Sequence, residues 1–185
     1  MSDFEFVFSL FGLLLGLSLA EVLGGFGKAL KARHRVRIGW LTPMLGLVVM
    51  LDLTSFWSAA WAMRDALPVK YFVLMLLLIF TGVYYLAATM VFPDDPDERP
   101  DFDEQYWDNK RLTVGAVFGL NLPYYIIDWS RGGVFIEDRV EVLIATVFML
   151  LLGGLWVVRS RFANLSLLAV LIALYPISGF YGMLT

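Results

Sequence analysis

The chain has 185 residues, of which 59% are hydrophobic, 16% aromatic and 17% charged, and its mean hydropathy is +0.74. A soluble domain is closer to half apolar and a quarter charged, so this composition predicts a protein embedded in lipid. The net charge of −3 argues against nucleic-acid binding, and the lack of cysteine excludes disulfides and thiolate metal sites.

Six apolar runs are long enough to cross a hydrocarbon core of about 30 Å, which takes roughly 20 helical residues. The runs lack the alternating pattern of barrel strands, so we expect helices. The acidic N-terminus, with no cleavage site after the first run, predicts that the first span is retained. We predict an all-α integral membrane protein, a single transmembrane domain over 1–185, with spans at 4–29, 38–63, 69–92, 111–129, 140–158 and 162–184.

The first predicted span carries a small residue at every fourth position: Gly12, Gly16, Ala20 and Gly24. Because an α-helix repeats every 3.6 residues, these positions form a ridge against which another helix can pack closely. Ser18 and Glu21 lie one turn away and place a carboxylate at a depth where lipid makes charge costly.

The connections between the spans differ in charge. The first, at 28–37, has five Lys and Arg side chains, and the odd-numbered connections together have ten. The other end has four, namely Arg64, Lys70, Arg131 and Arg139. Cationic connections stay in the cytoplasm, so we predict a multi-pass protein with both termini outside.

Asp52, near the middle of the second predicted span, is the sharpest chemical signal, and Ser55 lies on the same helix face. An ionised carboxylate at that depth is costly, so it must be neutral, paired or hydrated. One interpretation is a proton or cation site. The other is a protonated Asp52 that holds helices together through a hydrogen bond to a hydroxyl such as that of Tyr175.

The segment 93–111 is the largest polar region, and we predict that it is cytoplasmic. It contains eight acidic side chains. Asp101, with Glu104 three residues later, predicts the start of a helix that continues into the fourth span.

Glu21 and Asn121 are the other deep polar candidates. Glu21 is within reach of an arginine of the first connection or a tyrosine such as Tyr84, so structural pairing competes with a pathway role. Asn121 precedes Pro123, which cannot donate a backbone hydrogen bond and frees the carbonyl of Gly119. A free carbonyl and an amide suit a solute or ion, but they equally suit a kinked helix satisfied by its neighbours.

Two patterns recur in matching order. Gly12-Leu-Leu-Leu-Gly16-Leu-Ser18 resembles Gly115-Ala-Val-Phe-Gly119-Leu-Asn121, and Thr81-Gly-Val-Tyr84 resembles Ser178-Gly-Phe-Tyr181. Three spans per half would insert in opposite directions, which is the inverted-repeat plan of many transporters. The first and fourth spans are then expected to cross at their glycines. Chance recurrence is the alternative, because membrane helices use few residue types.

The basic Arg33-His-Arg-Val-Arg37 with Trp40 after it, the tryptophans late in the second span and Val91-Phe-Pro-Asp94 form an order of features. In this order the chain resembles small bacterial inner-membrane proteins without assigned function. The resemblance implies a bacterial plasma (inner) membrane location and carries no activity or site residues.

Two functions are consistent with these features. The first is a small ion or solute channel or carrier with a hydrated route lined by Asp52, Glu21, Ser18, Asn121 and Ser55. The second is a non-conducting scaffold or sensor whose basic 28–37 and acidic 93–108 segments bind a cytoplasmic partner or each other. We expect no enzyme, metal or cofactor, because a nucleophile with a base, a carboxylate dyad and a metal set are all missing. Six short helices leave little internal volume, so we expect a homo-oligomer.

Overall fold

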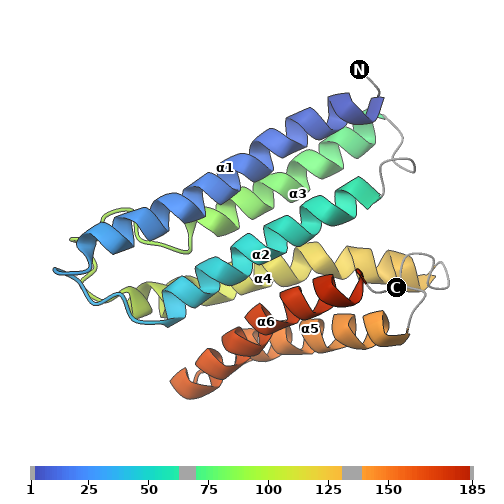
Figure 1. Ribbon diagram of the computed structural model, residues 1–185. Helices are drawn as coiled ribbons and strands as arrows, with labels where there is room; N and C mark the ends of the chain where they lie inside the picture. The colour runs from blue at the N-terminus through green and yellow to red at the C-terminus, as the bar shows by residue number, and fades with distance from the viewer. Residues whose placement is uncertain (1–2, 63–69, 131–138, 184–185) are drawn as a thin grey trace.

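The computed structural model describes residues 3–62, 70–130 and 139–183. They form six helices: α1 (Asp3–Ala32), α2 (Leu41–Ala62), α3 (Tyr71–Thr89), α4 (Phe102–Ser130), α5 (Arg139–Val157) and α6 (Arg161–Tyr181) (Figure 1). No strand occurs in these ranges. Every helix except α4 is long and apolar enough to span a membrane, whereas α4 begins with three charged turns. The predicted span ends at 63, 69 and 184 lie outside the described residues.

The helices run side by side and alternate in direction (Figure 1). α1 begins and α6 ends at the same end of the bundle, which we call the terminal end. The connections 33–40, 90–101 and 158–160 lie at the opposite end, which we call the basic end. Of the four cations predicted for the terminal end, Arg64 and Arg131 lie outside the described residues.

The six helices form two four-helix rings that share α2 and α4. In the first ring, α1 packs on α2 and α3, and α3 packs on α4. In the second, α6 packs on α2 and α5, and α5 packs on α4. Because α2 and α4 also pack on each other, they form the centre of the bundle, with one helix pair on either side (Figure 1).

The predicted crossing of the first and fourth spans is wrong, because α1 packs on α3 and α2 and its backbone does not come close to that of α4 in the described ranges. Gly16, Ala20, Gly24 and Gly119 lie exposed on the outside of the bundle. Gly12 faces Trp57 of α2, and Gly115 faces Trp156 of α5. The buried side of α1 instead follows alternating steps of four and three residues, which is the spacing of a helix–helix seam. Its members are Phe11, Leu15, Ser18, Val22, Gly25, Ala29 and Ala32.

The contact between α1 and α2 includes the side chain of Phe92, which follows α3 in the chain. Phe92 inserts its ring between Gly25 of α1 and Gly46 of α2, and it packs against Phe26 with ring centroids 4.9 Å apart. A Cβ on Gly25 would lie 2.3 Å from the Phe92 ring, and one on Gly46 would lie 3.0 Å from it. These two glycines are therefore small because a ring from another segment occupies the space beside them.

The two halves of the chain pack differently. α1 packs along α3, whereas the backbones of their counterparts α4 and α6 do not come within 8 Å of each other in the described residues, and side-chain pairs such as Asp103–Arg161 join these two helices. The inverted repeat has no support from this packing and stays a prediction.

The first connection and the start of α4 are joined through their backbones. Arg37 donates its N–H to the carbonyl of Pro100 at 2.7 Å, and Phe102 donates to the carbonyl of Arg37 at 2.9 Å. Asp101 Oδ1 accepts the N–H of Asp103 at 2.9 Å, which is the capping role predicted for it. Gly39 has φ +65°, and a Cβ there would lie 2.2 Å from the Asp103 carboxylate, so glycine is required.

Candidate functional site

Asp52 lies on α2 where the two rings meet, and only 2% of its surface is exposed. Tyr84 of α3 donates its hydroxyl to Oδ2 at 2.7 Å, and Tyr175 of α6 donates to Oδ1 at 3.0 Å. The amide of Asn121 of α4 donates across both oxygens, at 3.1 Å from Oδ1 and 3.2 Å from Oδ2. Donors from three helices thus converge on one carboxyl group.

Two of these donors lie one or two residues before a proline of the same helix. Tyr175 directly precedes Pro176, and Asn121 lies two residues before Pro123. Proline removes a backbone hydrogen bond and loosens the turn before it. The amide of Asn121 also donates to the carbonyl of Val117 at 2.9 Å, which fixes its orientation toward Asp52.

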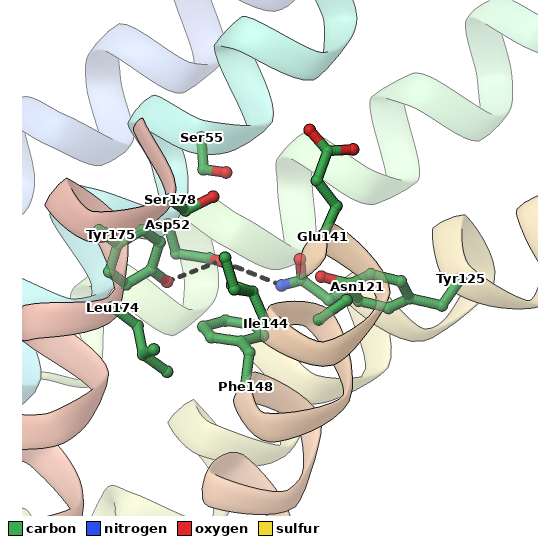
Figure 2. A pocket seen from close by; sticks show the side chains of 11 residues that line it. Asp52, Ser55, Asn121, Tyr125, Glu141, Ile144, Phe148, Leu174, Tyr175 and Ser178 are labelled. Carbon is green, nitrogen blue, oxygen red and sulfur yellow. Dashed lines mark hydrogen bonds between the residues drawn. The ribbon is translucent and has the colours of Figure 1, made fainter. Parts of the chain in front are cut away.

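A cavity of about 170 Å³ between α2, α4, α5 and α6 reaches Asp52 (Figure 2). Asp52, Asn121 and Tyr175 contribute polar groups to its deep part, whereas Tyr84 lies on the opposite side of the carboxyl group and does not line it. Toward the terminal end its lining is also polar and consists of Ser55, Tyr125, Glu141 and Ser178. Apolar side chains complete the wall: Ile144, Ala145, Phe148 and Leu174.

The charge of the cavity is negative. Asp52 and Glu141 line it, and none of the described residues that line it is Lys, Arg or His. In the part of the chain that the structure describes, the hydrogen-bond partners of Asp52 are the neutral side chains of Tyr84, Asn121 and Tyr175. A carboxyl group in such surroundings lacks a fixed cation, so a mobile proton or cation is the natural counter-charge.

Beyond Asp52, toward the basic end, the second ring is filled with apolar side chains. They are Val114 and Val117 of α4, Leu152 and Leu155 of α5, and Leu168 and Leu171 of α6, all buried. Among the described residues, the polar lining of this cavity therefore ends at Asp52.

The basic end of the second ring is closed by a polar network around Lys110. This side chain is 2% exposed, donates to Asn164 Oδ1 at 2.8 Å and to the carbonyl of Val158, and lies 4.9 Å above the Trp107 ring. Tyr106 donates to the same Asn164 oxygen at 2.6 Å. Burial, with a smaller effect of nearby arginines, lowers the pKa of Lys110 from its ordinary 10.5 to about 8.

Ion pairs join the basic 28–37 segment to the acidic 93–108 segment. Arg35 binds Asp97 at 3.0 Å, Arg37 lies 3.4 Å from Asp101, and Lys28 donates to the carbonyl of Asp94 at 3.2 Å. These pairs are mostly exposed, so each contributes little to stability. At the same end the buried carboxylate of Asp103 accepts from the exposed Arg161 at 2.6 Å and from the N–H of Leu41 at 3.1 Å.

The structure separates the residues of the predicted route into two groups. Asp52, Asn121 and Ser55 line the same cavity. Ser18 and Glu21 lie on α1, outside this cavity. Ser18 is buried and donates to the carbonyl of Leu14 at 2.9 Å, whereas Glu21 is half-buried. One of the partners suggested for Glu21, Tyr84, donates its hydroxyl to Asp52 instead.

The structural interpretation of Asp52 named Tyr175 as an example of a hydroxyl partner, and this bond is present. Three other features of the site have only a weak signal in the sequence. Tyr84 lies 32 residues from Asp52 in the chain, so its pairing depends on how α3 packs. Glu141 follows Arg139 in the first turn of α5, where a charge is ordinarily assigned to a span boundary. The burial of Lys110 could not be predicted from the sequence, because Lys110 is followed by Arg111 and two consecutive cations predict contact with lipid headgroups.

Comparison with protein-family models, with curated protein sequences and with solved structures finds no match for this chain. Its function is therefore inferred from the site geometry.

Proposed function

We propose that the protein is a small membrane carrier for a proton or a monovalent cation, with Asp52 as the binding group. The observation that supports this most strongly is the polar cavity that begins at the terminal end and stops at a buried carboxyl group among neutral donors. Intramembrane carboxyl groups of this kind are costly to keep and commonly mark an ion or proton pathway.

One-sided access favours a carrier over an open channel. The cavity reaches Asp52 from the terminal end, and buried apolar side chains such as Val117 and Leu171 fill the ring beyond it. The Lys110 network and the Asp103–Arg161 pair hold α4, α5 and α6 together at the basic end. A carrier needs such a closed side, and its transport cycle would open this end while closing the cavity around Asp52.

We further propose that the basic end faces the cytoplasm of a bacterial cell and that the helices lie in the plasma membrane. The excess of cationic side chains at the basic end supports this orientation. The homo-oligomer stays a prediction, and the exposed ridge at Gly16, Ala20 and Gly24 is the surface on which it would depend.

The scaffold or sensor alternative stays a second proposal. Its basic and acidic segments bind each other through Arg35–Asp97 and Arg37–Asp101, which is one of the two arrangements that it allows.

The test is transport by purified protein in liposomes. With an imposed membrane potential, we expect a cation or proton flux that Asp52→Asn abolishes, because the amide cannot carry the negative charge. Asp95→Asn is the matched control, since Asp95 is exposed at the basic end and far from the cavity. Wild-type vesicles that remain silent for protons and monovalent cations, or an unchanged flux in Asp52→Asn, would refute the proposal.

A further inference from the structure

We propose that the species bound at Asp52 is a small organic ammonium ion, with its positive group on the carboxylate and its carbon atoms against the ring of Phe148. This inference rests on the proposed function and adds the chemical class of the substrate. It depends on three properties of the cavity: its charge, the way Asp52 is presented and the composition of its walls.

The charge of the cavity suits a monovalent cation. Asp52 is the buried carboxyl group of the cavity (Figure 2), and Glu141, in the first turn of α5, lies nearer the terminal end. Divalent ions such as Ca²⁺ take six to eight oxygen ligands, usually from several carboxylates. Within the described ranges no group of three His, Cys, Asp or Glu side chains lies close enough to hold a metal ion.

Asp52 is presented to the cavity from one side. Tyr84 bonds Oδ2 from the buried side, while Asn121 and Tyr175 bond the carboxyl group and also line the cavity. An ammonium group entering from the terminal end can donate to Asp52 and to the oxygen of the Tyr175 hydroxyl. Charge-assisted hydrogen bonds of this type are roughly twice as strong as neutral ones.

The walls favour a cation that carries carbon atoms over a bare alkali ion. Phe148 and Tyr175 pack edge to face with ring centroids 5.6 Å apart, and Ile144 and Leu174 lie beside them. Aromatic faces attract ammonium ions, and apolar surface favours alkyl groups. A sodium ion would lose its hydration shell against these walls and gain few oxygen ligands in return.

The size of the cavity limits the ion. Its volume of about 170 Å³ is well below the roughly 300–1,000 Å³ of pockets that hold drug-sized ligands. An ion with a few carbon atoms, such as propylammonium, is therefore the appropriate probe. Glu141, Ser55 and Ser178 near the terminal end provide a polar, negatively charged approach for it.

The experiment is isothermal titration of the detergent-solubilised protein with propylammonium chloride, with sodium chloride and magnesium chloride as comparison salts. We expect saturable binding of propylammonium and none of sodium or magnesium at the same concentrations. Asp52→Asn is expected to abolish binding. Phe148→Leu keeps an apolar side chain but removes the ring, so we expect binding roughly 2- to 30-fold weaker. Phe162→Leu is the matched control, because Phe162 is 83% exposed at the basic end, and it should bind like the wild type.

Folding of each variant is checked by size-exclusion chromatography and circular dichroism. If Phe148→Leu does not fold, Ile144→Phe replaces it, because the larger side chain fills the cavity and should likewise weaken binding. Binding that survives Asp52→Asn, or that is equal in Phe148→Leu and the wild type, would overturn the inference.

The two proposals fail in different ways. A flux of protons or sodium that depends on Asp52, without any propylammonium binding, would overturn the ammonium inference and leave the carrier proposal standing. Propylammonium binding that depends on Asp52 in a protein whose vesicles carry no flux would support the inference and overturn the carrier.

Discussion

The adjacent residues Gly24 and Gly25 of α1 provide a matched test of the packing. A Cβ at position 25 would lie 2.3 Å from Cδ2 and 2.4 Å from Cγ of Phe92, whereas a Cβ at position 24 has no atom within 4 Å. Ordinary contact between carbon atoms is about 3.5–4.0 Å, so Gly25→Ala must displace the Phe92 ring by more than about 1 Å. The ring has little room to move, because Phe26 and Gly46 hold its other side.

Overpacking of this kind costs typically about 1–3 kcal/mol, whereas a substitution on the outside of a bundle usually changes stability by less than about 0.5 kcal/mol. We therefore expect Gly25→Ala to be less stable than Gly24→Ala by roughly 1–3 kcal/mol. Reversible SDS titration of the two variants, followed by circular dichroism, measures this difference. Equal stability of Gly24→Ala and Gly25→Ala would show that Phe92 does not lie between α1 and α2.

Three further predictions concern Asp103, Lys110 and Tyr84. Asp103→Asn should lower the free energy of unfolding by about 1–3 kcal/mol, because the buried Asp103 carboxylate caps α2 and pairs with an arginine. The exposed Asp108→Asn should lower it by under about 1 kcal/mol. SDS titration compares the two variants, and equal losses would contradict the burial of Asp103. The pKa of Lys110 is lowered from 10.5 to about 8 in the folded state. Between these two pH values the unfolded state therefore binds more protons than the folded state. The stability of the wild type should rise with pH from about 8 to 10.5. Thermal unfolding of Lys110→Met across that range should lack this rise, and identical pH profiles would refute the assignment. Tyr84→Phe should lower stability by about 1 kcal/mol, because it removes a buried hydrogen-bond donor to the Asp52 carboxyl group. Thermal unfolding of Tyr85→Phe should match that of the wild type. Equal effects of the two substitutions would exclude the hydrogen bond between Tyr84 and Asp52.

The sequence predicted the helices well because long apolar runs have few alternatives in lipid. The predicted span 140–158 matches α5 at Arg139–Val157 within one residue. The start of α4 was also predictable, since Asp101 has the chemistry of a helix cap and its carboxylate accepts the N–H of Asp103. These features depend on neighbouring residues alone.

The packing partners of each helix could not be predicted in the same way. Small residues such as Gly16 and Gly24 mark a surface on which close approach is possible, but they do not say whether a helix occupies it. On its packed face, α1 contacts Phe92 at Gly25, and these two residues are 67 positions apart in the chain. Long-range contacts of this kind leave no periodic signal in either segment.

One residue of the candidate site could be predicted from the sequence, whereas its partners depend on how the helices pack. Asp52 is conspicuous because a carboxyl group is expensive within an apolar run. Its partners Tyr84 and Asn121 are ordinary residues until the fold brings α3 and α4 against α2. Glu21, equally conspicuous by charge, lies outside the cavity because α1 does not take part in the second ring.

The central claim is that Asp52 is reached from the terminal end and closed off from the basic end, and the lack of cysteine in the chain allows a direct measurement. Single cysteines at Ser55, which lines the cavity, and at Val117, which is 1% exposed beyond Asp52, are labelled in oriented vesicles with a membrane-impermeant maleimide. We expect Ser55→Cys to react when the reagent is on the side of the terminal end, and Val117→Cys to stay unreacted from either side. Protection of Ser55→Cys from that side, or rapid labelling of Val117→Cys from the side of the basic end, would contradict the account.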